Sequence, residues 1–401
     1  MSNAPRILVT DAFRGSAIAI IRSLGRAGYQ VIAADEKPDS AGFKSRYAHE
    51  ALVYPSPEQS PEGFLEFMLE AARSRSIDLI IPVTDFAIQP LAAARASFAG
   101  LTRLALPTDD ALAVVTDKSK TIRLAQSLGI PVPRTFYVDT VQEALDAARQ
   151  LSWPLVLKPQ SSKKRSGDQR IESFEVGYAN SAAQLQQAMA RYQGKCTVLL
   201  QELLQGGGYG VEFLAHQGEP LAVFAHRRLR EVPLTGGVSS FRESIVPDPQ
   251  MYAHAARLVR ALGWTGLAMV EFKGAGTRAV LMEVNGRVWG SLPLATASGM
   301  DFPLLLARLY LDGPQAVTPQ LDYRYTVGLK CRDLPRDLSW MRRVLLRRNK
   351  YPFLPIPGRL AIFRALAGML DPRNRFDLFC LEDPWPALAD MRSITRKLRK
   401  A

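Results

Sequence analysis

Two glutamates sit inside otherwise apolar, strand-like segments late in the chain, and they constrain the fold more than any other feature. Glu271 lies within Leu267–Phe272, and Glu283 lies within Ala279–Asn285. An ionised carboxylate buried without a partner is very costly, so cationic groups must face both glutamates. Alternation along a strand puts Glu283 and Asn285 on one face. Two carboxylates and an amide oxygen form an all-oxygen set that suits Mg²⁺.

Other residues near these glutamates decide between a metal site and plain salt bridges. Taken singly, each glutamate is better explained by a salt bridge at a sheet edge. Arg287 follows Asn285 by two residues and extends the same face with donors for a carboxylate or phosphoryl oxygen. Lys158 ends the strand-like segment Trp153–Pro159, and Lys118 opens a helix. Together these lysines would neutralise phosphates from the side opposite the metal, which favours the metal site.

If the phosphates belong to a nucleotide, a further segment of the chain must bind its base. Gln201, Glu202 and Leu204 end the apolar strand-like run that begins at Thr197. A backbone carbonyl, a backbone N–H and a carboxylate at such a hinge would read the edge of an adenine ring. We therefore predict that this hinge holds the base of the nucleotide.

The first part of the chain alternates predicted strands and helices. The predicted strands are Arg6–Thr10, Tyr29–Asp35 and Asp78–Val83, and the predicted helices are Ser16–Ala27 and Pro61–Ser74. This βαβ pattern indicates a parallel, Rossmann-like sheet with ligand-facing loops at the strand ends. The first loop has a lone Gly15 and no GxGxxG motif, which argues against dinucleotide binding.

Composition excludes several other classes of protein. The 401 residues are 47% hydrophobic and 22% charged, as expected for two or three globular domains. The three cysteines show no CxxC pairing, which argues against a disulfide framework or a zinc cluster and suits a reducing compartment. The N-terminus resembles no secretion signal, and no apolar run is long enough to span a membrane. We expect a cytoplasmic protein.

The motifs, taken in order, resemble those of the ATP-grasp ligases. They are Asp117–Lys118, Gly129–Pro133 (GIPVP), Leu155–Pro159 (LVLKP), Gln201–Leu204 (QELL), Glu271–Phe272 and Leu281–Arg287 (LMEVNGR), spanning about half the chain. The resemblance implies two α+β subdomains that clasp ATP and two Mg²⁺ ions that bridge its phosphates. It also implies phosphoryl transfer to a carboxylate, followed by capture of the acyl-phosphate by a nucleophile.

The resemblance also implies roles for individual residues. Lys118 and Lys158 correspond to the phosphate-contacting lysines, and Glu202 to the acid of the adenine hinge. Glu271, Glu283 and Asn285 correspond to the metal ligands, and Arg287 to the arginine that steadies the transferring group. Two features depart from the family pattern. The phosphate flap, Ser161–Gln169, is basic with one glycine, and the ribose-binding acid has no clear match, although Glu212 is nearby.

A second polar cluster is the candidate site for the substrate. His226, Arg227 and Arg228 end a predicted strand facing the loop Thr235–Gly237, and Arg242 follows it. Arginines beside a glycine loop suit an anionic substrate, although they also fit the surface of a basic protein. His226 is the sole candidate general base, and a structural or substrate-orienting role for it is favoured.

The last part of the chain holds most of the net charge of +13. Cys331–Ala401 contains 16 Lys and Arg against 7 Asp and Glu, a net charge of +9. Its amphipathic segments predict helices that pack on the catalytic domains, with contact to an anionic membrane surface as the second interpretation. Nucleic acid is disfavoured because aromatic residues are thinly interleaved with the basic ones.

Together these observations predict an α/β Rossmann-like pre-ATP-grasp domain over residues 1–115. An α+β ATP-grasp domain follows over residues 116–315, and a basic, mainly helical extension over residues 316–401. The predicted function is ATP- and Mg²⁺-dependent (or Mn²⁺-dependent) ligation of a small-molecule carboxylate to an amine. The alternatives are a carboxylase or carbamoyl-phosphate-like enzyme, or a catalytically silent ATP-binding module with a membrane-surface tail. A homodimer is the default expectation.

Overall fold

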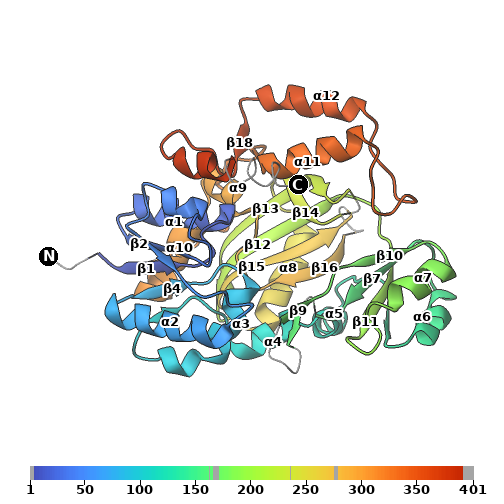
Figure 1. The fold of residues 1–401 in the computed structure, drawn as a ribbon, viewed down its shortest axis with the longest axis horizontal. Coiled ribbons are helices and arrows are strands. Elements are labelled where there is room, and N and C mark those ends of the chain that lie inside the picture. Colours follow the sequence, from blue (N-terminus) through green and yellow to red (C-terminus); the bar gives the residue numbers. More distant parts are fainter. Residues whose placement is uncertain (1–3, 162, 166–170, 235, 275–278, 392–401) are drawn as a thin grey trace.

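The computed structural model describes residues 4–161, 163–165, 171–234, 236–274 and 279–391, and it contains three separate larger sheets (Figure 1). Within these residues no helix is both long enough and apolar enough to cross a lipid bilayer.

The N-terminal sheet is parallel, with the strand order β3-β2-β1-β4-β5. Its strands are β1 (Arg6–Val9), β2 (Gln30–Asp35), β3 (Glu50–Val53), β4 (Leu79–Ile81) and β5 (Arg103–Leu104). The helices that connect them are α1 (Gly15–Arg26), α2 (Pro61–Ser74) and α3 (Asp85–Ala93). The loops after β1 and β4 meet where Thr84 Oγ1 donates to Asp11 Oδ1 at 2.9 Å. Asp35 accepts from the backbone N–H groups of Phe13 and Lys37, so this acid stabilises the first loop.

The second sheet has four antiparallel strands in the order β10-β7-β11-β6. They are β6 (Thr135–Val138), β7 (Leu155–Pro159), β10 (Gly177–Ala179) and β11 (Val198–Glu202). Helices α6 (Val141–Ala148) and α7 (Ala182–Met189) cover it, and their alanine and leucine faces share one apolar core with the strands. A separate short hairpin pairs β8 (Lys163–Arg165) with β9 (Ile171–Ser173).

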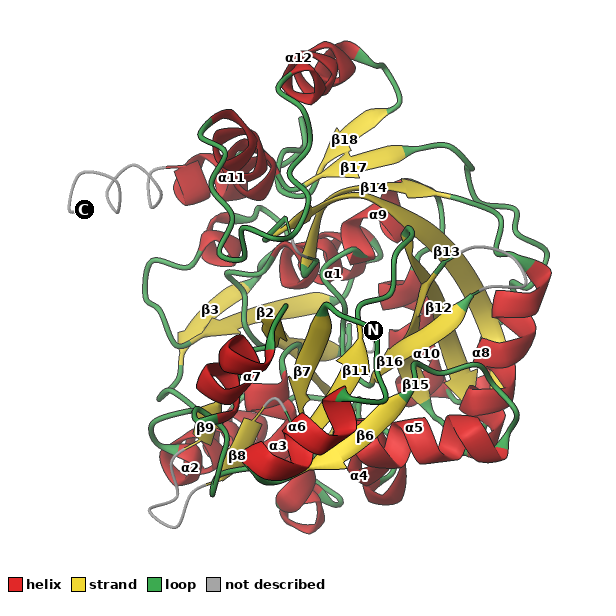
Figure 2. Ribbon diagram, turned by 90° about the vertical axis from the view of Figure 1, so that its right-hand side faces the viewer, coloured by secondary structure: helices red, strands yellow, loops and turns green. Residues whose placement is uncertain are grey.

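The third sheet is the largest, with seven strands in the order β16-β15-β12-β13-β14-β17-β18. The first five are β12 (Gly208–His216), β13 (Glu219–Val232), β14 (Val238–Ser244), β15 (Gly266–Lys273) and β16 (Val280–Asn285). The nearby helices are α4 (Asp109–Val115), α5 (Lys118–Ser127), α8 (Pro249–Ala261), α9 (Leu292–Ala297) and α10 (Phe302–Asp312). Figure 2 shows this sheet curving beside the smaller second sheet.

The C-terminal part contributes to the large sheet as well as forming helices. Strands β17 (Lys330–Arg332) and β18 (Asn374–Phe376) extend it beyond β14, an extension absent from our sequence interpretation. Three-residue strands are too short to leave a periodic pattern in the sequence. Helices α11 (Leu334–Leu345) and α12 (Leu360–Ala367) pack together around Trp340, Met341 and Val344. Residues 392–401, the end of the predicted basic extension, lie outside the described residues.

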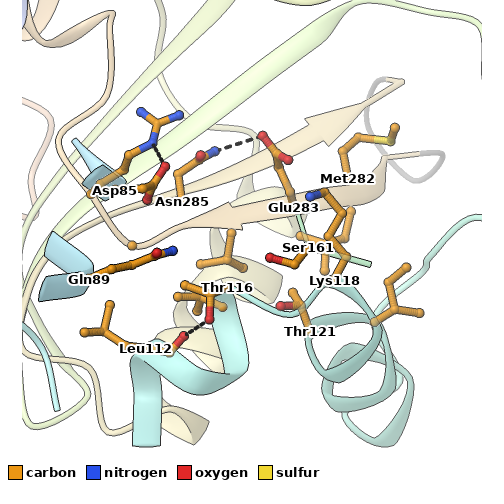
Figure 3. Close-up of a pocket in the computed structure, with 16 residues that line it drawn as sticks. Asp85, Gln89, Leu112, Thr116, Lys118, Thr121, Ser161, Met282, Glu283 and Asn285 are labelled. Atoms are coloured by element: carbon orange, nitrogen blue, oxygen red, sulfur yellow. Dashed lines mark hydrogen bonds and ion pairs between the residues drawn. The ribbon is translucent and has the colours of Figure 1, made fainter. Parts of the chain in front are cut away.

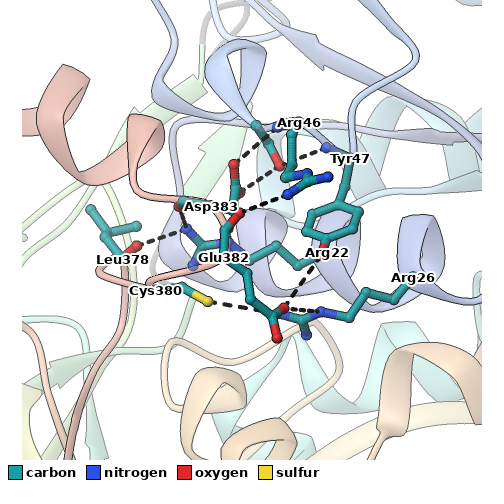
Figure 4. A network of polar contacts seen from close by, with 9 residues as sticks. Arg22, Arg26, Arg46, Tyr47, Leu378, Cys380, Glu382 and Asp383 are labelled. Atoms are coloured by element: carbon teal, nitrogen blue, oxygen red, sulfur yellow. Dashed lines mark hydrogen bonds and ion pairs between the residues drawn. The ribbon is translucent and has the colours of Figure 1, made fainter.

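A buried polar network fastens the C-terminal segment to the N-terminal sheet (Figure 4). The Asp383 carboxylate accepts from Arg22 Nε at 2.9 Å, from Ser45 Oγ at 2.7 Å and from the backbone N–H of Arg46 at 2.9 Å. Arg22 also donates to the Leu378 carbonyl. Arg22 and Asp383 are both buried and cannot be hydrated by bulk water. Each charge is therefore stabilised by the opposite charge of its partner.

We expect Asp383→Ala to lower the free energy of unfolding by about 3–5 kcal/mol, because it leaves the Arg22 guanidinium buried without its partner. Urea unfolding followed by tryptophan fluorescence measures the change. The matched control is Glu382→Ala, which removes an exposed ion pair to Arg26 and should cost no more than about 1 kcal/mol. Equal losses in the two variants would contradict this account of the network.

Candidate active site

The register of two neighbouring strands places two carboxylates side by side. Glu271 on β15 is directly opposite Glu283 on β16, and Met269 is opposite Asn285. Asn285 Nδ2 donates to Glu271 Oε1 at 3.0 Å and to Glu283 Oε1 at 3.2 Å, so all three polar groups share one face of the sheet. Like charges directly opposite each other on a sheet are destabilising, so this arrangement needs cations nearby.

Two lysines from other elements supply part of that positive charge. Lys158 lies on β7 of the second sheet, and Lys118 is the first residue of α5. Burial alone would raise the pKa of Glu283, but these two lysines, the Asn285 amide and Arg287 together hold that pKa below its usual range. Burial lowers the pKa of Lys158, with Glu283 opposing this shift. The lysines therefore face Glu283 across the space between two sheets.

The start of α5 explains why Lys118 and Lys158 lie together. Asp117 caps this helix by accepting from the backbone N–H groups of Ser119 at 2.8 Å and Lys120 at 3.2 Å. Gln160, just after β7, donates its side-chain amide to Asp117 at 2.8 Å and accepts from the Lys118 N–H at 2.9 Å. These bonds tie the helix start to the end of the strand that carries Lys158.

Glu271 is neutralised from the other side by Arg228 on β13. Arg228 Nη2 lies 2.5 Å from Glu271 Oε2. To reach it, the arginine crosses β12 at Gly208, where an added Cβ would lie 3.0 Å from Arg228 Cδ. Burial raises the pKa of Glu271, and the neighbouring Glu283 carboxylate adds to the rise while Arg228 opposes it.

His226 occupies the same polar face but is buried against a carboxylate. Its Nδ1 lies 2.5 Å from Glu212 Oε1, and neither side chain is accessible to solvent. Among the described residues, His226 Nε2 and Glu212 Oε2 have no further hydrogen-bond partner. This environment favours the structural role over the alternative of a general base. It also makes Glu212 unavailable to the surface as a ribose-binding acid.

A pocket opens beside Glu283 and reaches the N-terminal part of the chain (Figure 3). Arg287 Nε lies 3.2 Å from Asp85 Oδ2, at the start of α3. Lys118, Glu283 and Asn285 line the same pocket. Its other walls include Gln89, Leu112, Thr116, Thr121, Ser161 and Met282. Gln89, Thr116 and Thr121 carried no signal in the sequence, because single polar residues on helices are common.

The predicted adenine hinge lies at the end of β11, and none of its residues lines this pocket. The Gln201 side chain is buried and donates to Thr135 Oγ1 at 2.8 Å. Glu202 Oε1 accepts from the backbone N–H of Ser152 at 2.9 Å. The N–H of Leu203 donates to the Pro154 carbonyl at 3.0 Å, which fixes the backbone just before Leu204. Of the predicted flap, Ser161 lines the pocket, while residues 162 and 166–169 lie outside the described residues.

None of the four predicted substrate residues, His226, Arg227, Arg228 and Arg242, lines the pocket. Arg227 is half-exposed and pairs with Glu243 at 2.6 Å. Alternation along β13 puts it on the face opposite to His226 and Arg228. Arg242 is fully buried and pairs with Asp377 from the C-terminal segment. This ion pair holds the charge of Arg242 inside the protein, outside the lining of the pocket.

The residues present fit a divalent cation with oxygen ligands. No group of three His, Cys, Asp or Glu side chains suited to a metal occurs in the part of the chain that the structure describes. However, two carboxylate oxygens converge on the single Asn285 amide nitrogen, and a half-turn of that amide would present its oxygen instead. Mg²⁺ is commonly held by one or two carboxylates together with substrate phosphates. The site thus has the composition expected for a phosphate chain bound with magnesium.

Comparison with known proteins identifies the class. Residues 195–330 match the family described as "ATP-grasp in the biosynthetic pathway with Ter operon". D-alanine–D-alanine ligase from Ectopseudomonas mendocina (strain ymp) is 28% identical over 223 residues, which cover 51% of this chain and 68% of the relative.

Two solved structures share the fold. The biotin carboxylase domain of 2-oxoglutarate carboxylase from Hydrogenobacter thermophilus, a dimer with MgADP and bicarbonate, has a TM-score of 0.59 at 17% identity. The match covers 82% of this chain and 74% of that one. L-amino acid ligase from Bacillus licheniformis has a TM-score of 0.58 at 15% identity, covering 80% and 78%. Together these similarities support an ATP-dependent ligase with the ATP-grasp fold.

We expect Gly210→Ala to destabilise the polar face of the large sheet. The added Cβ would lie 2.5 Å from His226 Cε1 and 2.8 Å from Glu212 Oε1, so this buried pair must move apart. Overpacking of this kind costs about 1–3 kcal/mol, measurable as a lower urea midpoint. Gly358→Ala is the control, because nothing lies within 4 Å of its added Cβ. If the two variants unfold at the same urea concentration, the packing of His226 and Glu212 does not require a glycine at position 210.

Proposed function

We propose that this ligase activates a small-molecule carboxylate by phosphorylation with ATP and then couples it to an amine. The supporting observation is the meeting of Lys118 and Lys158 with Glu283 across two sheets, beside a pocket that contains Arg287. Phosphoryl transfer needs positioning and charge neutralisation more than a protein nucleophile, and this arrangement provides both.

Each group in the site has a role in this proposal. Glu271, Glu283 and Asn285 would hold Mg²⁺ (with Mn²⁺ as a substitute), which would neutralise the phosphate oxygens when bound. Lys118 and Lys158 would bind phosphate oxygens from the opposite side. The hinge of Gln201, Glu202 and Leu204 would hold the adenine, following the family resemblance.

We place the carboxylate substrate at Arg287, in the part of the pocket that Asp85 and Gln89 close. A guanidinium presents a planar fork of donors that matches a carboxylate or phosphoryl group. Asp85 currently accepts from Arg287, and an incoming anion would compete with it for this arginine. Arg228 and His226 lie farther along the same face and would orient the metal ligands, while Arg227 lies on the opposite face of β13 and has no part in this proposal.

The three predicted segments acquire roles on this basis. We assign residues 1–115 as a pre-ATP-grasp domain that closes the substrate end of the pocket through Asp85. Residues 116–315 would bind the nucleotide, and residues 316–401 would support the large sheet. Dimerisation of the Hydrogenobacter domain is a reason to test for a homodimer here.

Removal of one metal ligand provides the first test. In a screen of carboxylate and amine pairs that measures ADP release, Glu283→Ala should reduce turnover about a hundredfold or more, on the scale of losing a group that stabilises transition-state charge. Glu219→Ala is the matched control, since Glu219 lies on the same sheet in an exposed pair with Arg260. ADP release that the Glu283→Ala variant retains in full would refute the assigned metal site.

The same screen separates the competing reactions. ADP release that requires both a carboxylate and an amine supports the ligase proposal. Release that depends on bicarbonate without an amine supports a carboxylase-like or carbamoyl-phosphate-like reaction, which the biotin carboxylase fold makes the second candidate. A protein that binds MgATP but releases no ADP with any acceptor would be a silent nucleotide-binding module.

Substitution of Arg287 tests the substrate end of the pocket. We expect Arg287→Met to lower kcat by about 10²–10³-fold, because one preorganised donor to developing charge is lost. ATP affinity should change little, because the side chain beside this arginine is Asp85 and the phosphates are assigned to the lysines. Isothermal calorimetry and steady-state kinetics measure the two effects, with Arg260→Met as control. A variant that loses ATP affinity and turnover equally would place Arg287 at the nucleotide instead.

A further inference from the structure

Helix α12 is apolar on both of its faces, although only one is covered. Ala365 is buried, and Ala361, Ile362 and Met369 pack with it against α11. The outer side carries Leu360, Phe363, Leu366 and, just beyond the helix, Leu370, whose exposed fractions run from 48% to 87%. A helix that is apolar all round is normally buried on all sides, so this outer side lacks its partner in the isolated chain.

The helix also occupies an extreme position in the molecule. It lies at the upper edge in two views at right angles, with α11 below it in Figure 1 and strand β18 below it in Figure 2. Nothing in the described part of the chain projects beyond it in either view, so a flat surface could approach its outer side without meeting the catalytic sheets.

The sequence around this helix is mainly basic, although Asp371 follows Leu370 directly and Glu175 pairs with Lys350. Residues 338–370 contain seven Lys or Arg residues and no Asp or Glu. Among the cations, Arg359 and Arg364 are exposed on or beside α12, and Arg342 and Arg348 are exposed at the end of α11. Exposed Leu345 and Leu346 lie between these two α11 arginines. Exposed apolar side chains and exposed arginines in one stretch of the chain complement a surface with negative headgroups over a hydrocarbon layer.

We propose that the outer side of α12 is a docking surface for an anionic lipid membrane. Phe363 and the leucines enter the headgroup boundary, and the arginines pair with lipid phosphates. The helix lies in the plane of the interface. A second copy of the chain would also cover the apolar residues, but it would bring the same unbalanced cations into one interface, where like charges repel.

Vesicle flotation with the full chain tests this proposal. Binding to vesicles with 30% phosphatidylglycerol should exceed binding to pure phosphatidylcholine at least tenfold in 100 mM salt, and should weaken as salt rises. The double variant Phe363→Asp, Leu366→Asp should lose at least tenfold in vesicle affinity. Its fold should survive, since both side chains are exposed. Val53→Asp is the control, an exposed apolar residue on the N-terminal sheet.

Three outcomes would overturn the proposal. The first is equal binding to both kinds of vesicle, and the second is unchanged vesicle binding by the double variant. The third is that the unaltered chain does not bind vesicles but self-associates in analytical ultracentrifugation, and that the double variant does not self-associate. The last outcome would assign the surface to a second copy. None of them bears on the ligase proposal, because ADP release is measured without lipid.

Discussion

The opposition of Glu271 and Glu283 on adjacent strands is the interaction on which the rest of the site depends. Two carboxylates that share one face of a sheet repel each other, and burial increases the cost. The protein offsets it with cations drawn from three directions: Arg228 from the same sheet, Lys158 from the second sheet and Lys118 from a helix start. The carboxylates of the large sheet are therefore stabilised only when the second sheet and the start of α5 contribute their lysines.

The same balance connects the fold to the chemistry. Lys118 and Lys158 lie together because the Asp117 cap and Gln160 tie α5 to β7. Glycines on β12 leave room for Arg228 and His226 to reach toward Glu271. A polyphosphate with a divalent cation would add charges of both signs between these groups. The cation would pair with the glutamates and the phosphates with the lysines, whose positions are already set by the fold.

The sequence predicted those features that depend on local pattern. Period-two alternation correctly put Glu283 and Asn285 on one face, and the helix that opens at Lys118 follows its capping Asp117. The sequence alone could not predict the ion pair between Arg242 and Asp377, which lies 135 residues later in the chain. That pairing requires the C-terminal segment to fold back onto the large sheet. The exposed side of α12 was likewise hidden, since composition does not tell which face of an apolar helix is covered.

The most direct test of the central claim is calorimetric titration of ATP into the folded protein with and without magnesium. The account predicts ATP binding that strengthens at least about tenfold when Mg²⁺ is present, because bound metal relieves the repulsion between the two glutamates. ATP uptake of equal strength in excess EDTA, or no uptake in either condition by well-folded protein, would contradict it.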